Sequence, residues 1–307
     1  MTALTMSLVP SELTQPLLDG QVLPPDVDWS LTSAKSVDGN SRQMLSGAFD
    51  VAEMSLATFL KACERGGDFI GLPIFTGRGF LQPAIACRQG IAGPQELAGK
   101  RVGLPQFWMT SSIWHRGILH EQHGVSQELV QWLTEVEERF ERVEPPPHVH
   151  VERLPEGLSL KDALQRGELD AIMVPPRGAR TLGEIFSRPY PDVTEAQRAF
   201  MEQTGVWPIM HFVVMRRSLH DSLPSLASAL FAAFVEAKRI SAEAAGLPQP
   251  LPGLSDDAEA ALFGPDPWLY GLDQNRRPLE MFLRFSHDQG WLSQTLPLEN
   301  YFVPSLE

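Results

Sequence analysis

The side chains best suited to acid–base chemistry in this sequence are His211 and Glu53. His211 follows Trp207-Pro208-Ile209-Met210 in a stretch with strand character, and an imidazole can take up or release a proton near neutral pH. Glu53 and Ser55 leave a short strand at its C-terminal end, the edge at which open α/β sheets bind ligands. Glu53 could accept a proton from a ligand or orient His211. The alternatives are a buried histidine bonded only to backbone and a carboxylate that stabilises a helix start.

Several other groups could hold an anion. Arg78 lies between two glycines that let backbone approach a ligand, and its planar guanidinium matches a carboxylate. Hydroxyl groups and free backbone N–H groups come together where a helix is expected to begin, at Thr110, Ser111 and Ser112. Arg116 lies further along that helix, and Arg177 follows a buried strand. The alternatives are solvated or salt-bridged arginines and ordinary helix capping, which needs only one hydroxyl.

Aromatic residues accompany these segments. The tryptophans are Trp108, Trp114 and Trp207, and Phe80 and Phe107 lie nearby in the sequence. Aromatic walls would stack against a planar ligand. Packing in a core is the usual role of a single tryptophan, so only the clustering points to a binding site.

Length and composition exclude several classes of protein. The 307 residues are enough for two domains, and 25 Lys and Arg against 38 Asp and Glu give a net charge of −13. An acidic chain does not suit a nucleic-acid partner. The two cysteines, Cys63 and Cys87, cannot form a disulfide framework or a zinc ribbon. There is no Gly-rich phosphate loop, no GxSxG and no CxxC, so we expect no cofactor and no metal site.

The beginning of the sequence has no Lys or Arg before an apolar run and no small-residue cleavage site after one. No window approaches 18 uninterrupted apolar residues. We therefore expect a cytoplasmic protein that does not insert into a membrane.

Strand and helix signals alternate along the chain, which predicts an α/β fold. Strands are expected at 2–9, 49–54, 69–75, 81–87, 102–104, 148–154, 169–174 and 207–216. The clearest helix begins at Pro224 and carries one apolar face, formed by Leu226, Leu230, Phe231, Phe234 and Ala237.

Two segments, 95–105 (QELAGKRVGLP) and 160–176 (LKDALQRGELDAIMVPP), resemble in this order the second lobe of the type II periplasmic-binding-protein fold. The resemblance implies two α/β lobes with a ligand cleft between them, joined by two crossover segments near 76–83 and 204–211. The first lobe would contain residues 1–83 and 205–307, and the second would contain residues 84–204.

Four segments within that fold are similar to the 4,5-dihydroxyphthalate decarboxylase family: 49–60 (FDVAEMSLATFL), 99–119 (GKRVGLPQFWMTSSIWHRGIL), 204–219 (TGVWPIMHFVVMRRSL) and 266–272 (DPWLYGL). The resemblance implies non-oxidative loss of CO2 from an aromatic acid. Arg78 and the helix start at 110–112 would hold the carboxylate, and His211 with Glu53 would transfer protons.

The sequence departs from the family pattern at two places. Ser11-Glu12-Leu13-Thr14 stands where the family has an acidic–Tyr–acidic–Arg element, and Leu81 and Gln82 stand where it has an Arg-His pair. A buried carboxylate needs a cation or several donors, so the loss of these groups favours a substrate with a single carboxylate. Loss of the reaction is the other interpretation.

We therefore predict a cofactor-independent decarboxylase, a lyase that acts on a hydroxylated aromatic or similar small carboxylic acid. The alternative is a non-catalytic solute-binding protein of the ABC-transporter type for a small organic anion, because most proteins of this fold only bind. A biosynthetic or hydrolytic enzyme that reuses the cleft is a third interpretation. The sequence leaves open whether the protein is a homo-oligomer.

Overall fold

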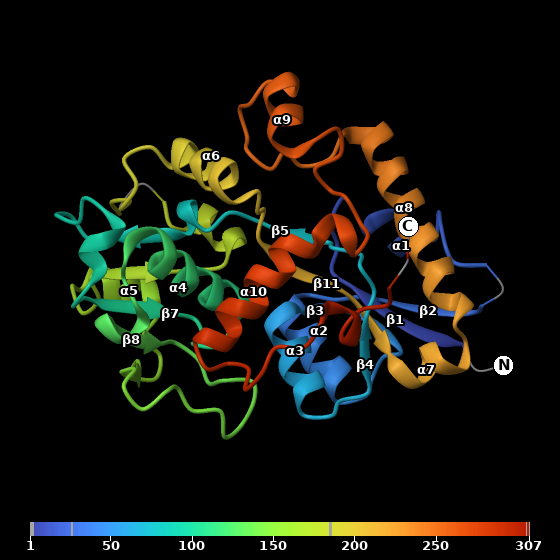
Figure 1. Cartoon of the computed structure of the whole chain (residues 1–307), viewed down its shortest axis with the longest axis horizontal. Coiled ribbons are helices and arrows are strands. Elements are labelled where there is room, and N and C mark those ends of the chain that lie inside the picture. Colours follow the sequence, from blue (N-terminus) through green and yellow to red (C-terminus); the bar gives the residue numbers. More distant parts are fainter. Residues whose placement is uncertain (1–2, 26, 184–185, 305, 307) are drawn as a thin grey trace. The chain divides into compact units, whose positions relative to one another are not determined.

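The computed structural model describes residues 3–25, 27–183, 186–304 and 306, and the chain divides into two compact units (Figure 1). Unit 1 contains Met1–Arg78, Ile209–Glu280 and Leu296–Glu307, and unit 2 contains Gly79–Pro208 and Met281–Thr295. Each unit has its own β-sheet with helices packed against it, so the predicted α/β class is confirmed.

The units differ from the predicted lobes in three segments: the short boundary stretches 79–83 and 205–208 and the longer segment 281–295. Residues 281–295, which we assigned to the first lobe, belong to unit 2. They include most of α10 (Arg276–Asp288), in which Phe282 and Phe285 place their ring centroids 5.2 and 5.6 Å from that of Trp114. The packing of this helix depends on contacts between segments far apart in the chain, so the sequence alone did not indicate which unit it joins.

The sheet of unit 1 mixes parallel and antiparallel strands. Its strand order is β2-β1-β3-β11-β4, and the short β5 also pairs with β11. β1 runs parallel to β2 and β3, whereas β11 is antiparallel to β3, β4 and β5. The strands are β1 (Leu4–Leu8), β2 (Trp29–Ser33), β3 (Val51–Ser55), β4 (Phe69–Gly71), β5 (Gly77–Arg78) and β11 (Ile209–Arg216).

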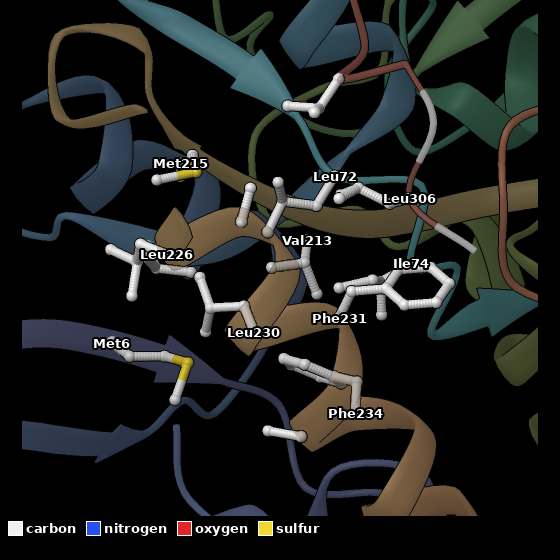
Figure 2. Close-up of a cluster of buried hydrophobic side chains, with 14 of the residues drawn as sticks. Met6, Leu72, Ile74, Val213, Met215, Leu226, Leu230, Phe231, Phe234 and Leu306 are labelled. Carbon is white, nitrogen blue, oxygen red and sulfur yellow. The ribbon is translucent and has the colours of Figure 1, made fainter. Parts of the chain in front are cut away.

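The core of unit 1 lies between this sheet and α8 (Ser225–Ala245). The apolar face of α8 that the sequence predicts is buried there, and Figure 2 shows Leu230, Phe231 and Phe234 directed toward side chains of the sheet. Burying each such side chain contributes about 1.5–3 kcal/mol. This packing holds β11, the strand that carries His211, in a fixed position.

The remaining helices of unit 1 are short, and α2 and α9 are each capped by a serine side chain. Ser36 accepts a hydrogen bond from the N–H of Gly39 at the start of α2, and Ser255 does the same for Ala258 in α9. The helices are α1 (Gln15–Leu18), α2 (Val37–Leu45), α3 (Leu56–Glu64), α7 (Arg217–Ser222) and α9 (Asp256–Phe263), with 3-10 turns η5 (Asp273–Asn275) and η6 (Leu298–Asn300).

The sheet of unit 2 has the order β6-β10-β7-β8-β9, and only β6 runs antiparallel to its neighbour. Its strands are β6 (Ile85–Cys87), β7 (Arg101–Leu104), β8 (Gln131–Thr134), β9 (Val151–Arg153) and β10 (Ala171–Met173). The helices are α4 (Thr110–His123), α5 (Leu160–Gln165) and α6 (Val193–Thr204), with 3-10 turns η1 (Gln82–Ala84), η2 (Pro94–Leu97), η3 (Gln127–Leu129) and η4 (Pro176–Thr181). In the described parts of both units, no helix combines the length and the apolar character needed to cross a membrane.

Gly117 gives a test of the packing of α10 on α4. A Cβ atom at Gly117 would overlap the ring of Phe285. Gly→Ala inside a helix normally stabilises by up to about 1 kcal/mol, but forcing a methyl group into a packed contact costs about 1–3 kcal/mol. We therefore expect Gly117→Ala to lower the free energy of unfolding, measured by urea denaturation.

Gly39→Ala in α2 is the matched control, because a Cβ there meets only the hydroxyl oxygen of Ser36, at 3.2 Å. It should leave the free energy of unfolding unchanged or raise it by up to about 1 kcal/mol. A gain in stability for Gly117→Ala would contradict the packing of Phe285 on α4.

Candidate functional site

The structure brings Glu53 and His211 together in unit 1. They lie on the adjacent antiparallel strands β3 and β11, where His211 is opposite Ser55 and Glu53 is opposite Val213. Side chains of paired residues lie on the same face of a sheet, so Glu53 and His211 are diagonal neighbours. The Oε1 atom of Glu53 lies 3.0 Å from Nδ1 of His211. Glu53 is 1% exposed and His211 9%.

The carboxylate of Glu53 collects donors from distant parts of the chain. The backbone N–H of Val9 donates to Oε2 at 2.5 Å, and the hydroxyl of Thr76 donates to Oε1. Burial raises the pKa of Glu53, but the hydrogen bonds and charge of His211 and the bonds from Thr76 and Val9 outweigh it, so the pKa is lowered overall. Glu53 is therefore ionised at neutral pH and can only accept.

An ionised Glu53 fixes which nitrogen of His211 carries a proton. Because a carboxylate only accepts, Nδ1 donates to it, and Nε2 is the nitrogen left to exchange a proton with a ligand. This is an arrangement for general acid–base chemistry, in which Glu53 orients the histidine.

Gly77 makes room for the imidazole ring. It is opposite His211 in the pairing of β5 with β11, and a Cβ atom at this position would overlap Nε2 and the ring carbons of His211. Thr76 and Gly77 therefore support the pair in different ways, one by a hydrogen bond and the other by the absence of a side chain. Neither role could be predicted from the sequence, although both residues immediately precede Arg78.

Arg78 follows Gly77 in β5 and is opposite Ile209, two residues before His211. Its Nη2 donates one hydrogen bond to the amide oxygen of Asn275 and another, of 3.3 Å, to the carbonyl oxygen of Leu269. Its guanidinium carbon lies 5.3 Å from the centre of the Phe75 ring. Burial lowers the pKa of Arg78 to about 10, so the side chain remains a cation at neutral pH. Unit 1 thus carries an acid–base pair and, on the strand beside it, a cation.

Ser55 and the segment that departs from the family pattern support the local structure around Glu53. The hydroxyl of Ser55 accepts a hydrogen bond from Thr58 at 3.2 Å in the first turn of α3. Thr14 is fully buried and donates to the carbonyl of Val9 at 2.6 Å, while the N–H of Val9 binds Glu53. Leu13 is also buried. Thr14 therefore helps to hold a backbone donor of the carboxylate.

The predicted anion-binding hydroxyls lie at the start of α4 in unit 2. Thr110, Ser111 and Ser112 are all buried there, and Ser112 donates to the carbonyl of Gln106 at 2.7 Å. The Oγ of Ser111 has no hydrogen-bond partner within the described residues.

Glu138 occupies the backbone donors immediately before this helix. Its carboxylate accepts from the N–H groups of Phe107 and Trp108, at 2.5 and 3.3 Å. Burial raises the pKa of Glu138. The two backbone hydrogen bonds and the charge of Arg116 act to lower it, but burial is the larger effect. A carboxylate of the protein thus uses two of the N–H groups near the predicted anion site.

Arg116 and two of the predicted aromatic residues lie inside unit 2. Arg116 is 1% exposed, donates to the carbonyl of Phe107 at 2.6 Å, and has its guanidinium carbon 3.7 Å from the centre of the Phe107 ring. The ring of Trp108 stacks on Trp291 with centroids 5.0 Å apart, and Trp114 packs on α10. These contacts favour a packing role for Trp114, the alternative that the sequence left open. Arg116 also packs inside the unit, so it is not the solvated arginine that was its alternative.

The other predicted residues of unit 2 are dispersed. Arg177 is exposed on η4, whereas Trp207 is buried with its ring 6.4 Å from that of Phe80. Leu81 and Gln82 are both buried. In the part of the chain that the structure describes, no three His, Cys, Asp or Glu side chains are grouped as ligands of a metal ion would be.

The contact of Gly77 with His211 can be tested by a double-mutant cycle. We expect Gly77→Ala to lower the free energy of unfolding by about 1–3 kcal/mol, because its methyl group overlaps the imidazole. In a His211→Ala background the same substitution should cost clearly less, since the ring is absent. Denaturant unfolding of the four proteins measures both values, and equal costs in the two backgrounds would refute the contact.

His115 of α4 predicts a pH dependence of stability. It is buried in unit 2 with Nε2 3.0 Å from the carbonyl of Val174, and burial lowers its pKa to about 4. Between about pH 6.5 and 4 the unfolded chain therefore binds a proton that the native chain does not, so stability falls as the pH falls. This contribution amounts to about 2 kcal/mol between pH 7 and pH 5.

His115→Gln can still donate to a carbonyl but does not titrate, so it is the comparison variant. Urea denaturation at pH 7 and pH 5 should show a drop that is about 2 kcal/mol smaller for the variant than for the native chain. Equal drops would show that His115 is not held neutral by burial.

Comparison with known proteins places this geometry in context. No family model matches the chain. A protein named 4,5-dihydroxyphthalate decarboxylase from Comamonas testosteroni is 29% identical over 314 residues, covering 95% of this chain and 94% of the relative. A protein of the same name from Pseudomonas putida is 32% identical over 169 residues, covering 52% of this chain and 66% of the relative.

Two solved structures show the fold. The periplasmic aliphatic sulphonate binding protein SsuA from Escherichia coli has a TM-score of 0.60 at 15% identity, covering 99% of this chain and 93% of its own. The desulfurization enzyme DSZB has a TM-score of 0.56 at 17% identity, covering 99% of this chain and 97% of its own. The resemblance inferred from the sequence is therefore confirmed: the chain has the periplasmic-binding-protein fold and is a relative of the 4,5-dihydroxyphthalate decarboxylases.

Proposed function

We propose that this chain is a decarboxylase that removes CO2 from a hydroxylated aromatic or similar small carboxylic acid, with its own side chains supplying the acid–base chemistry. The observation that carries the proposal is the Glu53–His211 pair, a buried carboxylate bonded at 3.0 Å to an imidazole. The two relatives named as decarboxylases support the class of reaction.

The reaction replaces a carboxylate on a ring carbon by a proton. In the proposed step, imidazolium Nε2 of His211 gives its proton to the ring carbon that carries the carboxylate. The bond between this carbon and the carboxylate then breaks, its electron pair restores the aromatic ring, and CO2 leaves. His211 becomes neutral and recovers a proton from solvent, so one proton is consumed and one CO2 is released. Glu53 stabilises the imidazolium between turnovers.

Arg78 is the proposed partner of the substrate's carboxylate. A guanidinium can form two parallel hydrogen bonds to a carboxylate, and its fixed charge selects an anionic ligand. Such a contact would hold the scissile bond of the substrate in a defined position. Holding reactants in a fixed geometry lowers the activation free energy of the reaction.

A second candidate function is binding of a small organic anion without chemistry. It is favoured by the similarity of the fold to that of a sulphonate-binding protein. The two functions share a ligand class but differ in product, since only the decarboxylase releases CO2.

The test is to incubate purified protein with a panel of hydroxybenzoic and phthalic acids while CO2 release and thermal shift are measured. We expect CO2 from at least one acid, and a loss of about 10²–10⁴-fold in kcat for His211→Ala, the usual contribution of a general acid. A thermal shift without CO2 across the panel would favour binding alone.

His148→Ala is the matched control, because this histidine is exposed and contacts only the surface residue Glu128 among the ion pairs that the structure describes. It should leave turnover unchanged. Full turnover in His211→Ala would remove the proposed catalytic role of that residue.

A further inference from the structure

Asn275 is a buried amide that contacts Arg78. It ends η5, a few residues after the 266–272 segment, and is 3% exposed. Its Oδ1 accepts a hydrogen bond from Nη2 of Arg78, and its Nδ2 donates to the carbonyls of Leu269 and Gly271, at 3.0 and 2.8 Å. Nothing in the local sequence marks this residue as part of a site.

These bonds determine the orientation of the amide. Only the nitrogen of an asparagine side chain can donate, so two backbone carbonyls on the nitrogen side leave the oxygen facing Arg78. The carbonyl of Leu269 also accepts from Nη2 of Arg78 at 3.3 Å. One nitrogen of the guanidinium, Nη2, is therefore bound to both the amide oxygen of Asn275 and the carbonyl of Leu269.

The amide binds Arg78 without adding a negative charge. Asp266 does act electrostatically on Arg78, but its carboxylate forms an ion pair with Nζ of Lys238. A carboxylate at position 275 would instead be a counterion in direct contact with the guanidinium. Asparagine is suited to hold a cation whose charge is needed for a ligand.

We propose that Asn275 is a positioning residue that orients the Arg78 guanidinium for the carboxylate of the substrate, an inference that rests on the proposed role of Arg78. Asn275 acts on anion binding and does not take part in proton transfer at His211. Its loss should therefore weaken binding of an acid much more than binding of a neutral ligand of the same shape.

The experiment compares 4-hydroxybenzoate with its neutral analogue 4-hydroxybenzamide by calorimetry. For Asn275→Ala we expect an affinity about tenfold weaker for the acid and changed less than twofold for the amide. Arg78→Lys should show the same selectivity, because lysine lacks the planar fork. Asn275→Asp should weaken acid binding at least as much as Asn275→Ala does.

Gln289→Ala is the matched control, since Gln289 is a buried amide of unit 2 whose nitrogen donates to the carbonyl of Ile113 at 2.9 Å. It should leave both affinities unchanged. An unchanged affinity of Asn275→Ala for 4-hydroxybenzoate, or an equal loss for both ligands, would overturn the positioning role.

Crystal structures of the native chain and of Asn275→Ala without ligand test the inference separately from the proposed function. A guanidinium that moves in the variant supports it, and an unmoved guanidinium overturns it, even if the native chain binds neither probe. Selective binding of 4-hydroxybenzoate, with no CO2 released from any acid of the panel, would count against the decarboxylase and leave the role of Asn275 intact.

Discussion

The buried charge of Glu53 is the interaction on which the candidate site depends. An ionised carboxylate inside a protein costs several kcal/mol unless donors surround it, and removing one donor leaves that cost uncompensated. Here the donors come from Val9, Thr76 and His211, which are far apart in sequence. A single side chain thus joins the end of β1, the segment before β5 and the strand β11. The same bonds that stabilise the charge also fix the histidine.

Gly77 and Asn275 support the basic groups of the site, His211 and Arg78, in different ways. Gly77 contributes by having no side chain, which admits the imidazole, whereas Asn275 contributes an amide that holds Arg78 without neutralising it. Glu53 and Asn275 both orient a basic group. The first does so with a charge, which fixes a proton on Nδ1 of the imidazole, and the second with a dipole, which leaves the guanidinium charge available. This difference suits a proton carrier and an anion receptor respectively.

Unit 2 shows why residue types alone are weak evidence for a site. An arginine on a helix whose first turn carries several hydroxyl groups suggests an anion-binding site, yet the guanidinium of Arg116 is covered by the Phe107 ring and bonded to a backbone carbonyl. Glu138 takes two of the nearby amides. The fold also does not show whether the protein is an enzyme, because one architecture can serve binding or catalysis. The argument for chemistry therefore rests on unit 1, where an acid–base pair is assembled.

The alternation of strands and helices and the apolar face of α8 could be predicted from the sequence, because each is a pattern within a few neighbouring residues. His211, Glu53 and Arg78 could also be chosen as candidates from residue type and position. Four features could not be predicted in this way: the assignment of residues 281–295 to unit 2, the bond from Thr76 to Glu53, the space at Gly77 and the amide of Asn275. Each of these depends on contacts between segments distant in the chain, and only folding brings such segments together.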